Sequence, residues 1–197
     1  MLAGLAALVL LTAPEATATA EREPISLQMQ TYLVAPATDG QWLFGAEGKA
    51  LIGRFGVTLG GYQQALYGPP GTTRRLGSLL VGLAVRFELS HGIALGAALG
   101  VNSLFVAPDV ASIAPSAGFF GSFRLTDWLT AELAMDAAAW PHYRLDGLSQ
   151  VTAHWRRLTF SAGARVVHLE APPRLGLGVA GVTSIGAQVG LGVEWSG

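Results

Sequence analysis

The chain has 197 residues, a formal net charge of −1 and no cysteine. This length suits one domain, and the near-neutral charge gives no reason to expect a nucleic-acid partner. The absence of cysteine excludes disulfide frameworks and thiolate metal sites. Only 13% of the residues are charged, whereas 51% are hydrophobic and 26 are glycine. A soluble domain usually carries about 25% charged residues, so something other than water must cover much of the surface.

The first twenty residues have the composition of an export signal. Residues 2–13 are almost entirely apolar, and small residues follow at 18–20. The apolar run is shorter than the roughly 20 residues that a membrane-spanning helix needs. No Lys or Arg follows Met1, which departs from the usual positive start of such a segment. We therefore expect a signal peptide over 1–20 and one folded domain over 21–197.

Apolar and polar residues alternate along almost all of the remaining chain, beginning with the segment ISLQMQTYL at 25–33. A period of two residues is typical of a β-strand with one apolar face, and not of a helix. The alternation predicts ten strands, near residues 25–33, 42–51, 55–65, 76–89, 93–105, 116–125, 129–140, 149–155, 158–168 and 178–195.

The connections between these segments alternate in length. Short turns are expected at 52–54, 90–92, 126–128 and 156–157, and longer connections at roughly 35–41, 66–75, 106–115, 141–148 and 169–177. An even number of strands with short turns on one side and longer loops on the other is typical of membrane barrels. The sequence therefore predicts an all-β, antiparallel up-and-down transmembrane β-barrel of about ten strands, with eight strands as the alternative.

Charged residues avoid the apolar face of every predicted strand. The opposite face carries Glu47, Lys49, Arg86, Glu88, Arg124, Glu132, Asp136, Arg165 and Glu194. Glycine also gathers on this polar face, whereas Leu, Val and aromatic residues crowd the other. Small side chains suit a narrow interior, and a charge facing lipid costs roughly 2–4 kcal/mol at mid-membrane. We therefore expect the polar face to line the lumen, unlike the inverse arrangement of a soluble lipocalin-like barrel.

Aromatic residues are expected to form two belts at the membrane interfaces, although packing in a core is the alternative. One belt, near the long connections, comprises Tyr32, Trp42, Phe44, Tyr62, Phe105, Phe119 and Trp140. The other, near the short turns and the C-terminus, comprises Phe55, Phe87, Phe123, Trp128, Trp155 and Trp195.

The last predicted strand contains an alternating apolar series, namely Ala187, Val189, Leu191, Val193 and Trp195. With this pattern the chain resembles the broad family of small Gram-negative outer-membrane β-barrel proteins. The series itself resembles the C-terminal signal that the barrel-assembly machinery reads in that family. The resemblance implies an outer-membrane location, contact with membrane lipid and lipopolysaccharide, and insertion by that machinery. We expect a monomer without a cofactor.

Six of the charges are expected at one depth near the short turns: Lys49, Arg86, Glu88, Arg124, Glu132 and Glu194. They should pair with one another, because unpaired charge in a narrow interior is costly. Glu47, Asp136, His154 and Arg165 are expected nearer the long connections. One interpretation is a salt-bridged plug in a barrel with a structural role in the envelope. The alternatives are a narrow passive pore for ions or small solutes, and a surface recognition or adhesion barrel, which the modest loops disfavour.

Catalysis is the competing class of function. In the family that the chain resembles, barrel proteases share an Asp-x-His pair and lipid A deacylases a His-x-Ser pair, and neither occurs around the four histidines. His142 and Asp146 share a predicted loop, but this spacing specifies no chemistry. The histidines also lack metal-ligand spacing. The sequence therefore predicts no enzymatic activity and no metal site.

Four arginines fall in predicted long connections: Arg74, Arg75, Arg144 and Arg174. The forked guanidinium suits phosphate groups. Solvated loop charge is the favoured interpretation of these four residues, and contact with lipopolysaccharide phosphates is the alternative.

Overall fold

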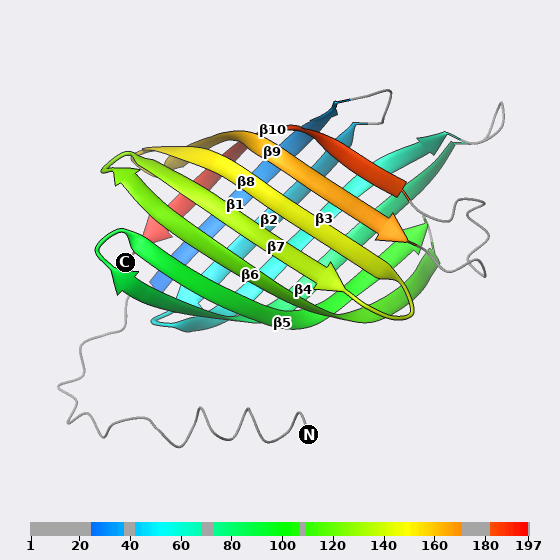
Figure 1. Ribbon diagram of the computed structural model, residues 1–197, viewed down its shortest axis with the longest axis horizontal. Helices are drawn as coiled ribbons and strands as arrows, with labels where there is room; N and C mark the ends of the chain where they lie inside the picture. The colour runs from blue at the N-terminus through cyan, green and yellow to red at the C-terminus, as the bar shows by residue number, and fades with distance from the viewer. Residues whose placement is uncertain (1–24, 38–41, 68–72, 107–108, 171–181, 197) are drawn as a thin grey trace, which may run out of the picture.

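The computed structural model describes residues 25–37, 42–67, 73–106, 109–170 and 182–196. Ten antiparallel strands close into one barrel (Figure 1), in which sequential strands pair and β1 pairs with β10. They are β1 (Ile25–Pro36), β2 (Leu43–Ile52), β3 (Phe55–Tyr67), β4 (Thr73–Ser90), β5 (Ile93–Val106), β6 (Asp109–Thr126), β7 (Leu129–Ala138), β8 (Tyr143–Trp155), β9 (Leu158–Glu170) and β10 (Val182–Ser196). The predicted antiparallel barrel is confirmed, with ten strands and not eight. Within the described ranges, no helix is long and apolar enough to cross a membrane.

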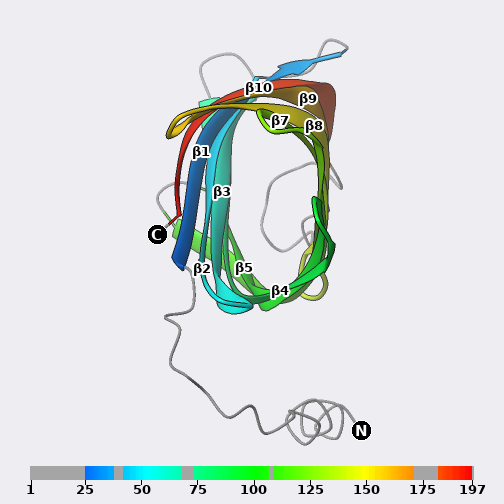
Figure 2. The ribbon, with the colours of Figure 1, turned by 90° about the vertical axis from the view of Figure 1, so that its left-hand side faces the viewer.

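The two ends of the barrel differ. Short turns join β2 to β3, β4 to β5, β6 to β7 and β8 to β9, as the sequence predicts, at the left of Figure 1. Gly53 and Gly92 occupy two of these turns with φ of 59° and 97°, values that glycine adopts without steric cost. We name this the short-turn end and the opposite one the loop end. Figure 2 looks along the barrel from the short-turn end and shows an oval ring of strands.

The strands extend further toward the loop end than the sequence predicts. β4 begins at Thr73, β6 at Asp109 and β8 at Tyr143. Much of the predicted connections at 106–115 and 141–148 is therefore strand, and these two expectations are wrong. Residues 171–181, which include most of the last predicted connection, lie outside the described ranges.

Pro115 is the reason that the start of β6 is hard to recognise, because proline usually interrupts a strand. In the barrel it pairs with Val101 of β5. Its carbonyl accepts a hydrogen bond from the Ala139 N–H on the opposite side, just past the end of β7. The last residue pair between β6 and β7 is Ser116–Ala138, so Pro115 lies just beyond the end of this ladder. The missing N–H of Pro115 therefore faces a place where no ladder hydrogen bond is needed.

The two faces of the barrel separate as the alternation predicts. Outward Leu83 and Leu99 are 72% and 69% exposed, whereas inward Leu43 and Leu104 are 0% exposed. All nine charged residues assigned to the polar face line the lumen. An exterior of Leu, Val, Ile and aromatic side chains suits a lipid bilayer and not water, so the apolar face is the membrane-facing one.

Aromatic side chains lie on the exterior at both ends, which agrees with two interfacial belts. Examples are Trp42 and Phe44 at the loop end, and Phe55, Trp128 and Trp155 at the short-turn end. Tyr32 and Tyr62 are exceptions, since they are only 2% and 4% exposed. Both occupy inward positions of their strands, so their assignment to a belt is wrong.

Gly100 of β5 allows a close approach between neighbouring strands. A Cβ at this position would lie 2.1 Å from the Val81 carbonyl oxygen and 2.6 Å from Gly82 Cα, so the backbone would have to shift. We expect Gly100→Ala to lower the free energy of unfolding by about 1–3 kcal/mol, the usual cost of overpacking.

Gly147→Ala is the matched control, because a Cβ there meets no atom within 4 Å. Urea unfolding in lipid vesicles measures the stability of both variants. The fraction of folded barrel at each urea concentration is read from its heat-modifiable migration on a gel. Equal losses of stability in the two variants would contradict the packing argument.

Candidate functional site

Apolar side chains fill the part of the lumen nearest the loop end. Six inward residues, which we name the apolar plug, are at most 4% exposed: Val34, Leu43, Leu76, Leu104, Val167 and Leu169. They come from the loop-end portions of β1, β2, β4, β5 and β9. Interiors of narrow barrels are normally packed by side chains in this way. These buried side chains narrow the described part of the lumen, beside buried polar residues such as Gln64, Ser184 and Asn102.

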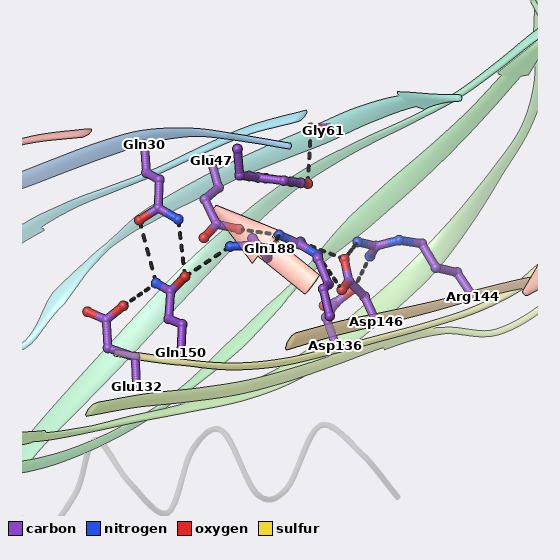
Figure 3. A network of polar contacts seen from close by, with 11 residues as sticks. Gln30, Glu47, Gly61, Glu132, Asp136, Arg144, Asp146, Gln150 and Gln188 are labelled. Carbon is purple, nitrogen blue, oxygen red and sulfur yellow. Dashed lines mark hydrogen bonds and ion pairs between the residues drawn. The ribbon is translucent and has the colours of Figure 1, made fainter. Parts of the chain in front are cut away.

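An ion cluster lies next to the apolar plug, centred on Asp146 of β8 (Figure 3). Arg165 of β9 donates from Nε and Nη2 to the two carboxylate oxygens of Asp146, each at 2.8 Å. Arg144 of β8 donates to Asp146 and also to Asp136 of β7. Arg165 reaches Glu47 of β2 at 3.3 Å. The side chains of Arg144, Asp146 and Arg165 are at most 6% exposed, so their charges need these partners.

Two tyrosine rings join the ion cluster to the apolar plug. The guanidinium carbon of Arg165 lies 4.0 Å from the centre of the Tyr32 ring, and that of Arg144 lies 5.5 Å from the Tyr62 ring. Both rings also belong to an apolar cluster with members of the plug. A ring face attracts a cation, and the attraction is greater where water is excluded. The tyrosines therefore form a boundary that is compatible with charge on one side and aliphatic carbon on the other.

Glutamine side chains form an amide layer beside the ion cluster (Figure 3). Gln188 and Gln30 both donate to Oε1 of Gln150, at 2.9 and 3.3 Å. Gln150 and Thr152 in turn donate to the carboxylate of Glu132. Gln188 also accepts from Arg165 at 3.3 Å, which connects the two groups. These hydrogen bonds connect β1 and β10 to β7 and β8 inside the lumen, past the intervening strand β9.

The remaining lumen is a cavity of about 910 Å³ at the short-turn end. Its lining reaches from His91 and Asp127, beside the short turns, to Arg144, Asp146 and Arg165. The cavity therefore runs from the short-turn end to the ion cluster, where buried side chains close it.

The structure does not bring the six charges expected near the short turns into one paired set. Arg86 and Glu88 pair at 3.4 Å, but the Glu88 side chain is 76% exposed. Lys49 Nζ lies 4.2 Å from the Phe120 ring centre, and Arg124 is exposed. These groups surround an open cavity in which water can solvate them, so they need not neutralise one another.

The other two charges, Glu132 and Glu194, have polar partners. Glu132 belongs to the amide layer, and Glu194 accepts from His154 Nδ1 at 2.9 Å. His154 was expected nearer the long connections, and that placement is wrong, because it lies close to the turn between β8 and β9. Glu47, Asp136 and Arg165 do lie deeper, as expected, in the ion cluster.

The expected lipopolysaccharide arginines are placed differently from one another. Arg144 is wrongly assigned to an external loop, since it is only 5% exposed and points into the lumen. Alternation through the start of β8 carries the missed signal: Tyr143 and Leu145 face outward, and Arg144 and Asp146 inward. Arg75 is exposed at the loop end of β4, and Arg74 precedes it in the same strand. Arg174 lies outside the described residues.

His142 does not pair with Asp146. It lies between β7 and β8 and is fully buried. Its ring contacts the side chains of Ser112 and Asn102, an association that no local spacing in the sequence indicates. Among the residues that the structure describes, no group of three or more His, Asp or Glu side chains is placed to hold a metal ion.

No family model matches the chain, and no curated protein sequence is significantly similar to it. Its structure is similar to that of Ail, the attachment invasion locus protein of Yersinia pestis, at 10% identity and a TM-score of 0.37, over 89% of this chain and 99% of that one. It is similar to KdgM porin at 10% identity and a TM-score of 0.38, over 88% and 99%. It is also similar to Neisserial surface protein A, at 14% identity and a TM-score of 0.32, over 87% of this chain and 94% of that one.

Similarities of this size carry no argument about what the chain does. The barrel's own geometry is more informative: a closed antiparallel sheet, an apolar exterior and a polar lumen. This combination belongs to the bacterial outer membrane. The protein is an integral outer-membrane β-barrel.

The ion cluster makes Asp146 a critical residue for stability. Asp146→Ala would leave two buried arginines with fewer partners, and we expect it to lower the free energy of unfolding by about 3–5 kcal/mol. Glu88→Ala removes one partner of an exposed pair, and we expect a change below about 1 kcal/mol.

Urea unfolding in lipid vesicles compares the two substitutions directly. If Asp146→Ala were no more destabilising than Glu88→Ala, the ion cluster would not hold the barrel together as described.

Proposed function

We propose that this protein is a closed, non-conducting barrel with a structural role in the outer membrane. The observation that carries the proposal is the apolar plug, which places six aliphatic side chains, each at most 4% exposed, in the loop-end part of the lumen. The ion cluster and the tyrosine rings lie directly against it, so two different kinds of packing close the same passage.

The geometry is less favourable to a narrow pore. A conducting lumen needs a continuous lining of polar groups or water, whereas the cavity here ends at Arg144, Asp146 and Arg165. The hydrogen bonds inside the lumen instead connect β1 and β10 to β7 and β8, which suits a barrel whose rigidity is its contribution to the envelope. We further propose that residues 1–20 direct export, that the assembly machinery inserts the barrel, and that the barrel is a monomer.

Electrical recording in planar bilayers tests the closed lumen. We expect the purified protein to give no conductance steps, because the apolar plug excludes water and ions. Ohmic steps that change when Glu132 is replaced by Gln would contradict the proposal and favour the pore.

A variant with a widened lumen, which loses two residues of the apolar plug and the neighbouring Tyr32, tests whether the recording would detect a passage. We expect brief openings when Tyr32, Leu43 and Leu104 are all replaced by Ala, since these are 2%, 0% and 0% exposed inside the lumen. The matched control replaces Leu83, Leu95 and Leu99 by Ala, because these side chains face lipid, and it should remain silent.

We also propose that Arg74 and Arg75 contact lipopolysaccharide phosphates. Arg75 is exposed at the loop end of β4, the end that an outer-membrane barrel presents to the external leaflet. A forked guanidinium donates to two phosphate oxygens at once.

Replacing Arg74 and Arg75 by Ser should reduce the extra stability that lipopolysaccharide gives over phospholipid vesicles, measured by urea unfolding. Arg156 and Arg157, at the short-turn end, provide the control pair, and their replacement should leave the lipopolysaccharide effect unchanged. An equal effect of the two double variants would contradict this contact.

A further inference from the structure

Three residues that are distant in the sequence form a hydrogen-bonded chain near the loop end. Ser112 Oγ of β6 lies 2.6 Å from His142 Nδ1, in the connection between β7 and β8. His142 Nε2 lies 2.9 Å from Asn102 Oδ1 of β5. A hydroxyl, an imidazole and an acceptor in this order are the parts of an activated serine nucleophile.

The partners of Asn102 define the direction of the chain. Its Nδ2 donates to Ser78 Oγ at 2.8 Å and to the Leu79 carbonyl at 3.4 Å, so Oδ1 is the atom that faces His142. Oδ1 has no proton, and His142 Nε2–H must therefore be the donor. His142 Nδ1 is then unprotonated and accepts from the Ser112 hydroxyl. This tautomer is the one in which a histidine can take a proton from serine.

The surroundings keep His142 in its neutral form. Burial lowers its pKa, and the positive charge of Arg144 lowers the pKa further. A neutral imidazole at neutral pH is available as a general base, whereas an imidazolium is not.

The backbone beside Ser112 is irregular. Leu104 pairs with Ser112 and Phe105 pairs with Val110, so the register passes over Ala111, which forms a β-bulge. Bulges redirect neighbouring side chains and are frequent beside active sites. Ser112 is partly exposed, whereas His142 and Asn102 are buried, so Ser112 is the member of the three that is in contact with the surroundings.

We propose that Ser112, His142 and Asn102 form a hydrolytic site for carboxylic esters. Ser112 and His142 are the catalytic residues, and Asn102 is a positioning residue that orients the imidazole. Serine, histidine and an acceptor act together on unrelated folds, where geometry and not sequence order identifies them.

The reaction has two balanced steps. Ser112 Oγ bonds to the ester carbonyl carbon while its proton passes to His142 Nδ1; the bond to the leaving alcohol breaks, and the alcohol takes that proton. Water then attacks the acyl-serine, His142 takes its proton, and the carboxylic acid leaves as Ser112 regains a hydrogen. Neither step requires a cofactor or an oxidant.

The substrate class follows from where the site lies. Trp140, two residues before His142, is 72% exposed, and Tyr143, directly after it, is 53% exposed. Exposed aromatic residues of a membrane barrel lie at the level of the lipid headgroups. Ser112 itself lies on the inward face of β6, so we assign the ester to an acylated amphiphile whose headgroup is at this depth, by the loop-end opening of the lumen. The site is independent of whether the lumen conducts.

The first test is labelling of the folded, detergent-solubilised full-length protein with a fluorophosphonate. Attack by Ser112 Oγ forms a bond to phosphorus and expels fluoride, so mass spectrometry should find one adduct on Ser112. Ser112→Ala should abolish the adduct. Ser116→Ala, which removes another inward hydroxyl of β6, should retain it, and heat-unfolded protein should not be labelled.

Hydrolysis of p-nitrophenyl esters with short and long acyl chains tests the substrate class and the roles of the residues. We expect long chains to be preferred, and His142→Ala to lower the rate by about 100-fold or more. Asn102→Ala should lower the rate as well, and Asn102→Asp, which keeps the acceptor, should restore it.

Absence of an adduct on the folded wild-type protein would overturn the proposal, as would equal labelling after unfolding. The hydrogen bonds of Ser112, His142 and Asn102 would then serve only to anchor the connection between β7 and β8. In that case His142→Ala would lower the unfolding temperature, and the wild-type protein would hydrolyse no ester above the rate of Ser112→Ala. Preference for short chains would overturn the assigned substrate class.

Discussion

Two buried arginines must be neutralised inside a narrow barrel, and much of the lumen is arranged around that constraint. Asp146 accepts three hydrogen bonds from Arg144 and Arg165, and both arginines also contact a tyrosine ring. Charge removed from water needs partners on every side. The chain meets this need with a carboxylate on each neighbouring wall, at Asp136 and Glu47, and with the amide of Gln188.

Position along the barrel decides how each polar side chain behaves. At the short-turn end the cavity admits water, and Lys49, Arg124 and Glu88 are accommodated without a shared network. Farther in, water is excluded, and the polar groups become members of the ion cluster or the amide layer. At the loop end the apolar plug occupies the lumen beside a few buried polar groups, such as Gln64, Ser184 and Asn102, which hydrogen-bond to protein partners. The lumen therefore changes from solvated to paired to largely apolar over the length of one barrel.

The closed lumen and the Ser112–His142–Asn102 chain are separate features that share one cause. Because His142 and Asn102 are buried, their polar groups must be satisfied by protein partners. The two ring nitrogens of His142 hydrogen-bond to the Ser112 hydroxyl and to the Asn102 amide oxygen. In this arrangement the imidazole can accept a proton from the hydroxyl, as ester hydrolysis requires. A barrel can thus be closed to passage and still hold reactive groups at its outer rim.

Alternation along the strands was sufficient to predict the barrel, its ten strands, its short turns and the lumen-facing charges such as Glu47 and Arg165. These are local consequences of a period of two residues beside lipid. The tertiary structure alone decided which charges meet. Arg144 looked like a loop residue until β8 extended to Tyr143, and Ser112, His142 and Asn102 share no local pattern. Which side chains meet in a lumen depends on strand register and on depth, because water screens charges at an open mouth and not in a filled interior. The order of residues along one strand determines neither its register with other strands nor its depth in the barrel.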